Sequence, residues 1–149
     1  MREAVVVMAK RTPIGKVGGQ FSTLEPEQLV APLIQEILKE TTIPAEMIDD
    51  VILGNVIGPG GNIARFSALE ADLPVTVPGV TVDRQCGSGL EAINLAASLV
   101  QSGAGDIYFA GGVESVSRAP WKTKKPKTLQ GYPEIYTRAP CPYRLFLNS

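Results

Sequence analysis

The chain has 149 residues, enough for one domain, and its 44% hydrophobic and 19% charged residues are typical of an ordinary globular protein. Its net charge of -1 lacks the basic excess of a nucleic-acid-binding protein, so we expect no nucleic-acid partner. No apolar run reaches the roughly 18 residues of a membrane span, and the N-terminus lacks a signal-peptide pattern. We therefore expect a cytoplasmic protein with reduced thiols and no membrane partner.

The chain contains no histidine. Histidine is the side chain whose ordinary pKa lies nearest neutrality, so a self-contained Cys-His or Ser-His catalyst cannot be built from these residues. The two cysteines, Cys86 and Cys141, are too few for a disulfide framework.

Charge is distributed unevenly between two parts of the chain. Residues 1–117 hold 7 basic and 14 acidic residues, whereas residues 118–149 hold 7 basic residues and 1 acidic residue. The second part also carries 5 of the 12 prolines and shows neither helical nor strand periodicity. We predict a compact domain at 1–117 and an irregular segment at 118–149, in which the basic run KTKKPK at 122–127 is solvated or disordered.

Apolar runs of two kinds alternate within the first part. In chain order, they predict a strand at 4–8, a helix at 27–40, a strand at 50–56, a helix at 62–71, a strand at 79–82, a helix at 87–102 and a strand at 106–113. Strands separated by helices in this order favour the α/β class with βαβ layering and a mostly parallel sheet.

The helix predicted at 27–40 carries its apolar residues on one stripe and follows Pro26, a favourable residue for a first helical turn. Pro32 removes one hydrogen bond from this helix and is expected to bend it.

The helix predicted at 87–102 has one narrow polar stripe, formed by Glu91, Asn94, Ser98 and Gln101, and is otherwise apolar or small. So little polar surface predicts a helix that is buried inside a layered protein.

Cys86 stands where an apolar strand gives way to this helix. The unpaired N–H groups and the dipole of a helix N-terminus favour an anion, and the thiolate is the nucleophilic form of cysteine. Gly87 and Gly89 would let a substrate approach the backbone, and N–H groups of the turn could face a developing oxyanion. Cys86 is thus a candidate nucleophile.

Two alternatives stay open for this stretch. On position alone, an isolated cysteine such as Cys86 is more often a small buried core residue than a nucleophile. In addition, GSGLEA at 87–92 fits the dinucleotide-binding pattern G-x-G-x-x-A, although the acidic residue expected about 20 positions later, Asp106, begins the next strand instead of ending it.

Four sequence blocks, taken together, resemble the thiolase family of acetyl-CoA acetyltransferases and 3-ketoacyl-CoA thiolases. They are RTPIGKVGG at 11–19, VILGNVIGPGGNIAR at 51–65, DRQCGSGLEA at 83–92 and AGGVESVSRAP at 110–120. The resemblance implies the thiolase fold, of which this chain resembles the first, N-terminal βαβ-layered half and the beginning of a loop domain. The departures are Asp83, where many members have asparagine, and Pro32.

The resemblance also implies a mechanism and partners. Cys86 would be the nucleophile that takes the acyl group, with acyl-CoA and CoA as substrates in fatty acid metabolism, no further cofactor and no metal, and with dimers or tetramers as the assembly. In the family, a histidine in a G-H-P block and a cysteine in a C-x-G-G block complete the site, and neither block exists here. Cys141 has no flanking glycines, so we interpret it as an incidental surface thiol.

The last residues, CPYRLFLNS, match nothing in the family pattern and indicate a truncated or frameshifted reading frame. Three hypotheses follow: the N-terminal part of a thiolase that is inactive alone, a dinucleotide-binding module, and a non-catalytic interaction protein.

Overall fold

The computed structural model describes residues 2–135, so that Cys141 lies outside the described residues. The chain divides into two compact units, residues 1–119 and residues 120–149. The first unit holds the sheet and the helices, and the second is described as far as residue 135.

The first unit is built on a three-stranded parallel sheet. Strand β1 (Asp50–Gly54) lies in the centre and pairs with β2 (Gly79–Val82) on one side and β3 (Tyr108–Gly112) on the other. Ile52 of β1 is in register with Val80 and with Ala110, and both pairings are parallel. The α/β class and the parallel sheet that the sequence predicts are therefore confirmed.

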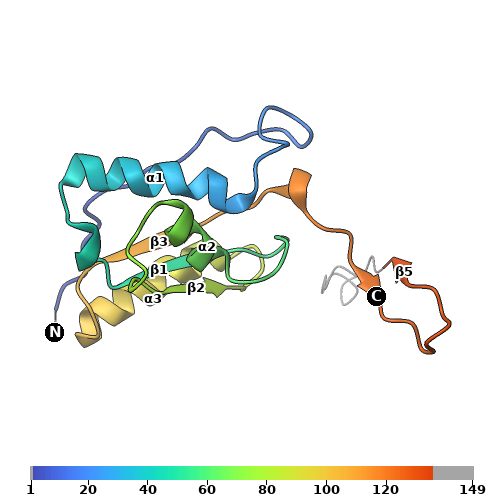
Figure 1. Cartoon of the computed structure of the whole chain (residues 1–149). Coiled ribbons are helices and arrows are strands. Elements are labelled where there is room, and N and C mark those ends of the chain that lie inside the picture. Colours follow the sequence, from blue (N-terminus) through green and yellow to red (C-terminus); the bar gives the residue numbers. More distant parts are fainter. Residues whose placement is uncertain (1, 136–149) are drawn as a thin grey trace, which may run out of the picture. The chain divides into compact units, whose positions relative to one another are not determined.

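Helices cover both faces of this sheet (Figure 1). Helices α1 (Pro26–Thr41) and α2 (Ile63–Glu70) lie on one face, where Val51 and Leu53 point into a shared core. Helix α3 (Ser88–Ser102) lies on the other face, where Ile52 packs against Ala92 and Ala96. Successive residues of β1 thus point into cores on opposite faces of the sheet. For this reason Val51, Ile52 and Leu53 are all apolar.

Helix α1 begins at Pro26, one residue before the predicted start, and the Gln28 side chain accepts a hydrogen bond from the Glu25 N–H at 3.0 Å. Its buried residues include Val30, Ala31 and Ile34. Pro32 lies inside the helix and is exposed, so its ring faces away from the core. A short 3-10 helix (Ala45–Met47) then leads into β1.

The strand predicted at 4–8 is wrong, because these residues pair with no strand in the part of the chain that the structure describes. Val5, Val6 and Val7 are 72%, 79% and 72% exposed. The segment is held on either side of its valines by ion pairs, from Arg2 to Asp106 and from Lys10 to Glu40, each at 2.5 Å. β-branched residues such as valine favour an extended backbone, but a strand also needs a neighbouring strand to form hydrogen bonds with its backbone.

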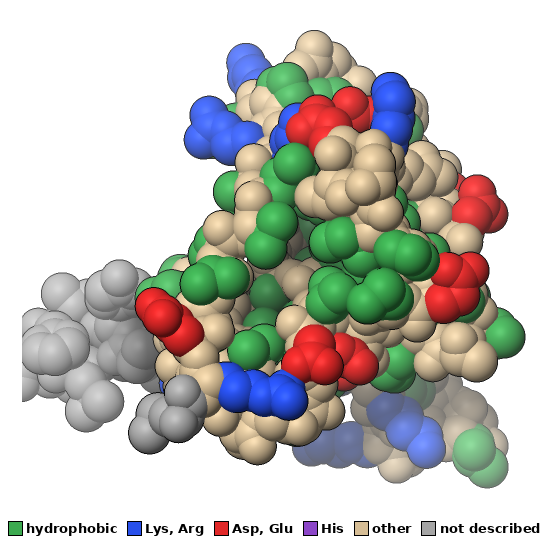
Figure 2. All heavy atoms as spheres, turned by 90° about the vertical axis from the view of Figure 1, so that its left-hand side faces the viewer, with side chains coloured by type: hydrophobic (Ala, Val, Ile, Leu, Met, Phe, Trp, Pro, Cys, Tyr) green, Lys and Arg blue, Asp and Glu red, His purple; other side chains and the backbone are tan. Residues whose placement is uncertain are grey.

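The first residues of the chain lie on the face that Figure 2 presents, and hydrophobic side chains gather in the surface there. The described residues offer the three valines no layer to pack against, which leaves an apolar surface in water.

The sequence predicts that α3 is buried inside a layered protein, and in this chain one of its faces is buried while another is exposed. Ala92 and Ala96 are buried against the sheet, but Leu90 is 64% and Ile93 is 45% exposed. These two side chains lie three residues apart and therefore share one face of the helix. We call Leu90 and Ile93 the outer face of α3.

The second unit contains a small antiparallel pair, β4 (Thr123–Lys124) with β5 (Glu134–Ile135), where the sequence predicts no regular structure. Two residues on each side are too few for periodicity to show. Lys122, Lys124, Lys125 and Lys127 are all exposed, as expected for a solvated run.

Candidate functional site

The candidate site lies at the carboxyl edge of the parallel sheet. Because β1, β2 and β3 run in the same direction, the segments that follow them begin at one edge. These are residues 55–61 after β1, residues 83–87 after β2 and residues 113–117 after β3. Ligands of open α/β sheets bind at this edge.

Cys86 lies in the tight turn between β2 and α3, two residues before the first residue of the helix. Its side chain is exposed and its thiol is free. The alternative of a small core residue is therefore not what the structure shows. The helix that follows has 15 residues, long enough for its N-terminus to favour a negative charge.

The residue before the cysteine has an unusual backbone. Gln85 has φ of +52°, in the left-handed region that a non-glycine side chain rarely adopts, at a cost of about 1–3 kcal/mol. Its N–H donates to Asp83 Oδ1 at 2.9 Å. The Gly87 N–H donates to the Arg84 carbonyl at 3.1 Å and closes the turn around Cys86.

Ser88 connects this turn to the helix. Its hydroxyl donates to the Gln85 carbonyl at 2.6 Å and accepts from the Arg84 N–H at 2.8 Å. The residue is only 4% exposed, so water does not readily replace either bond.

A charged pair flanks the turn on its solvent side. Arg84 Nη1 lies 2.9 Å from Glu91 Oε2, and the arginine side chain is 69% exposed. Exposed pairs of this kind contribute little to stability, so the turn is held mainly by its backbone and Ser88 hydrogen bonds.

Glycines bring the start of α3 into direct contact with the ends of two strands. A Cβ atom on Gly54, the last residue of β1, would lie 2.5 Å from the Ser88 carbonyl carbon and 2.6 Å from the Gly89 nitrogen. A Cβ atom on Gly112, the last residue of β3, would lie 3.1 Å from the Gly89 Cα. The absence of side chains at these positions therefore sets how closely the Cys86 turn approaches the sheet.

Replacing Gly54 by alanine tests this contact. We expect Gly54→Ala to destabilise the fold by about 1–3 kcal/mol, because the new methyl group meets backbone atoms that cannot rotate away. Gly111→Ala is the matched control, since a Cβ at Gly111 meets no atom within 4 Å. Urea unfolding measures the free energy of unfolding of both variants. An equal decrease in the two would contradict the close contact between Gly54 and the start of α3.

Glu114 ties the segment after β3 to the segment after β1. Its carboxylate accepts hydrogen bonds from the Val56 N–H at 2.5 Å, from the Ile57 N–H at 3.2 Å and from Asn55 Nδ2 at 3.2 Å. The Asn55 amide also donates to the Val113 carbonyl at 2.8 Å. These bonds fix the two strand ends on which the Cys86 turn rests.

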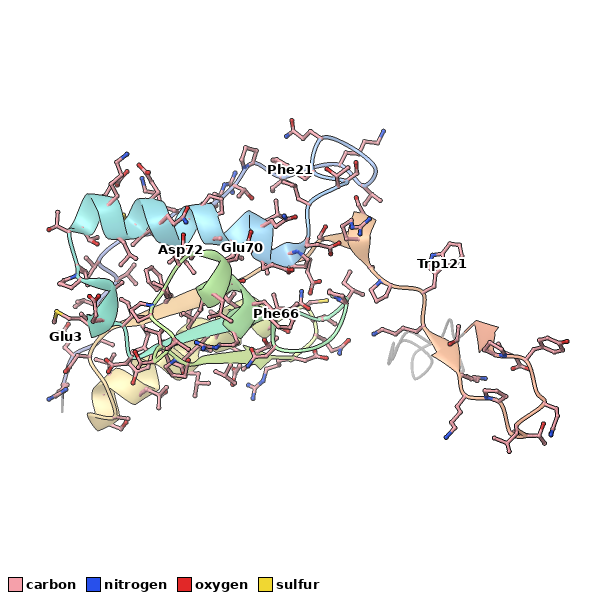
Figure 3. All side chains as sticks on the ribbon, viewed as in Figure 1. Glu3, Phe21, Phe66, Glu70, Asp72 and Trp121 are labelled. Carbon is pink, nitrogen blue, oxygen red and sulfur yellow. The ribbon has the colours of Figure 1, made fainter. Side chains whose placement is uncertain are left out.

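A hollow of about 250 Å³ adjoins the same edge, between residues 12–17 and residues 112–117. Phe21, labelled in Figure 3, also lines this hollow and packs against Gly15, where a Cβ would lie 2.7 Å from the ring. The Gly18 N–H donates to Ser117 Oγ at 2.9 Å across this region.

All four sequence blocks contribute to this one edge of the sheet. The blocks at 11–19 and 110–120 share the hollow, the blocks at 51–65 and 110–120 share the Glu114 hydrogen bonds, and Gly54 contacts the block at 83–92. Segments that are far apart in the sequence therefore meet at the edge of the sheet where α3 begins.

The dinucleotide alternative gains nothing from this geometry. Glu114, the acidic residue that follows β3, already bonds three donors of its own chain and so lacks the free carboxylate that a ribose would need. Within residues 2–135 no group of three or more potential metal-ligating side chains gathers, and no helix there is long and apolar enough for a membrane span.

Sequence reasoning missed Ser88, Asn55, Glu114, Gly54 and Gly112, which surround the Cys86 turn. Two signals were present: a glycine lies near the end of the first and the last of these strand patterns, and a polar residue follows within two positions, Asn55 after Gly54 and Glu114 after Gly112. Conversely, a Cβ at Gly87 or Gly89 would meet no atom closer than 3.4 Å, so these two glycines are not required by packing.

Comparison with known families identifies this architecture. The chain matches the family described as "Thiolase, N-terminal domain" over residues 4–136. The chain belongs to the thiolase family, and the resemblance seen in its four blocks is confirmed.

Relatives within the family are similar over nearly the whole chain. A Staphylococcus aureus protein named as an acetyl-CoA C-acetyltransferase, VraB, is 55% identical over 141 residues, and the match covers 93% of this chain but 37% of that protein. Its counterpart from Staphylococcus epidermidis is 52% identical over 142 residues, again covering 37% of the relative. The chain thus spans little more than a third of the length of these relatives.

A solved structure shows the same fold. The Bacillus anthracis acetyl-CoA acetyltransferase superposes with a TM-score of 0.76 at 37% identity, covering 84% of this chain and 33% of that protein. The thiolase-like α/β fold of the N-terminal part is thereby established.

Proposed function

We propose that this chain is the N-terminal part of an acyltransferase of the thiolase type, in which Cys86 takes the acyl group from an acyl-CoA thioester. The observation that carries the proposal is the exposed, free thiol of Cys86 in a tight turn at the N-terminus of α3. Family membership and the names of the acetyl-CoA acetyltransferase relatives support the substrate class.

The chemistry follows from the geometry of the turn. The Cys86 thiolate attacks the thioester carbonyl carbon, a new C–S bond forms, and the carbonyl electrons move onto oxygen. Collapse of this intermediate expels the CoA thiolate and leaves an acyl-enzyme. A second substrate, the carbanion of acetyl-CoA or free CoA, then accepts the acyl group.

The proposal assigns the Cys86 N–H as a donor to the developing oxyanion. Within residues 2–135 no group accepts a hydrogen bond from the Cys86 N–H, which leaves it free for a substrate oxygen. Preorganised backbone donors of this kind contribute strongly to acyl transfer.

The chain supplies only part of such a site. It has no histidine to activate the thiol or return a proton, and it has no C-x-G-G block. We therefore propose that the chain acylates without completing a catalytic cycle. A homo-oligomer and a cytoplasmic location stay predictions, as does the absence of any cofactor besides the CoA substrates.

Selective labelling tests the reactive thiol. We expect Cys86 to alkylate faster than Cys141 when the folded protein meets limiting iodoacetamide near neutral pH, because the Cys86 thiol is free and exposed in the turn before α3. Peptide mass spectrometry separates the two sites, and urea-unfolded protein is the control in which the difference should shrink. Preferential labelling of Cys141 in the folded protein would count against Cys86 as the nucleophile.

A further inference from the structure

We infer that Ser88 is a positioning residue for acyl transfer, whose hydroxyl holds the peptide between Gln85 and Cys86 so that the Cys86 N–H faces away from α3 as the donor to an acyl oxygen. This inference rests on the proposed function of Cys86. It assigns to Ser88 a role distinct from that of an ordinary helix-end residue.

The first step is the orientation of the Gln85 carbonyl. It accepts two hydrogen bonds from the same residue, one from the Ser88 hydroxyl at 2.6 Å and one from the Ser88 N–H at 3.0 Å. Both draw the carbonyl oxygen toward the first turn of α3.

The second step follows from peptide geometry. The peptide between Gln85 and Cys86 is trans, so its N–H points opposite to its carbonyl. With the Gln85 carbonyl turned toward α3, the Cys86 N–H points away from it. This is the free N–H to which no described group of the chain offers an acceptor.

The third step is the strain that the hydroxyl opposes. Gln85 is left-handed, with φ of +52°, and ordinary backbone angles lie far from this value. The Ser88 hydroxyl bonds both sides of Gln85, at the Arg84 N–H and at the Gln85 carbonyl. Without the hydroxyl, two of the hydrogen bonds that hold Gln85 in its left-handed conformation are lost. Rotation of the Gln85 backbone then turns the Cys86 N–H away from its position.

Two reactions of the same thiol separate this role from general stability. Acylation by a thioester forms an Sγ–C bond, places negative charge on the carbonyl oxygen and then expels a thiolate. Alkylation by iodoacetamide forms an Sγ–CH₂ bond and expels iodide, and no oxygen gains charge. Only acylation uses an oxyanion donor, so the ratio of the two rates at Cys86 reports the position of the N–H.

The experiment measures both rates on the full chain by peptide mass spectrometry, with S-phenyl thioacetate as the acyl donor because it requires no CoA contacts. Ser88→Ala removes the hydroxyl and Ser88→Thr retains one. The matched control is Ser98→Ala, which removes an exposed hydroxyl bonded to the Asn94 carbonyl at 2.9 Å in the same helix.

We expect the acylation-to-alkylation ratio to fall about tenfold or more in Ser88→Ala, because losing a placed oxyanion donor slows acyl transfer by about 10²- to 10³-fold and displacing it costs part of that. The ratio should hold in Ser98→Ala and in Ser88→Thr. An unchanged ratio in Ser88→Ala, or an equal fall in Ser98→Ala, would overturn the assignment.

Backbone NMR provides a second readout that does not depend on acylation. The Gln85 and Cys86 Cα shifts should move in Ser88→Ala and stay in place in Ser98→Ala, since only the first releases the left-handed residue. If Cys86 of the unaltered chain alkylates but does not acylate, the proposed function fails while these shifts still test the positioning role. Identical Gln85 shifts with and without the Ser88 hydroxyl would refute that role.

Discussion

Purified alone, the chain is expected to give no sustained cleavage of acetoacetyl-CoA by CoA, although it carries the proposed nucleophile Cys86. No histidine is present to act as the general base, and loss of a positioned acid–base group typically lowers the rate about 10²- to 10⁴-fold. Proton transfer at the α-carbon has no assigned group either, so the losses compound.

The assay follows the loss of acetoacetyl-CoA in the presence of CoA and includes Cys86→Ala as the control. Equal background rates in the two proteins are the expected outcome. Sustained turnover that disappears in Cys86→Ala would mean that the described turn recruits a base from another side chain, and the proposal of an incomplete site would be wrong.

The outer face of α3 should make the isolated chain associate with itself and bind hydrophobic dyes. Leu90 and Ile93 are 64% and 45% exposed on a helix whose opposite face already packs on the sheet. The doubly substituted variant Leu90→Gln with Ile93→Gln should bind much less dye, because it removes apolar surface without touching the buried Ala92 and Ala96.

Light scattering and dye fluorescence measure this effect, with Ser98→Gln as a control because Ser98 is an exposed polar residue of the same helix. Association should fall in the double variant and persist in the control. A monodisperse, dye-silent unaltered chain would show that the outer face is covered in solution.

The sequence predicted the bounds of α1, α2 and α3 to within one residue at each end, and it predicted those of the sheet less closely. β2 occupies the predicted residues 79–82, whereas β1 and β3 end earlier than predicted, at Gly54 and Gly112. Hydrophobic runs indicate which residues are buried. The strands β1 and β3, however, end where their last residues contact the backbone of α3. A contact between segments that are distant in the sequence produces no local sequence pattern.

The failure at residues 4–8 has a different cause. Three successive valines favour an extended backbone, but pairing depends on a neighbouring strand that the described residues do not provide. The same reasoning applies to Leu90 and Ile93, whose apolar character predicts burial without specifying what buries them.

The sequence predicted that Cys86 lies between a strand and a helix, which the structure confirms, but it did not predict the residues that hold this turn in place. Position at a strand–helix junction singled out Cys86, because a helix N-terminus has a definite chemical consequence. The hydrogen bonds of Ser88 and Glu114 depend on how loops from three strands meet, so they emerge only when the fold is known.

Transfer of an acetyl group to Cys86 tests the central claim most directly. The full chain is incubated with acetyl-CoA, digested under conditions that preserve thioesters, and mapped by mass spectrometry beside Cys86→Ala. Our proposal predicts an acetyl group on the peptide that contains Cys86, formed slowly and absent from Cys86→Ala. Acetylation confined to Cys141 or to lysines, with Cys86 unmodified but still able to alkylate, would contradict it.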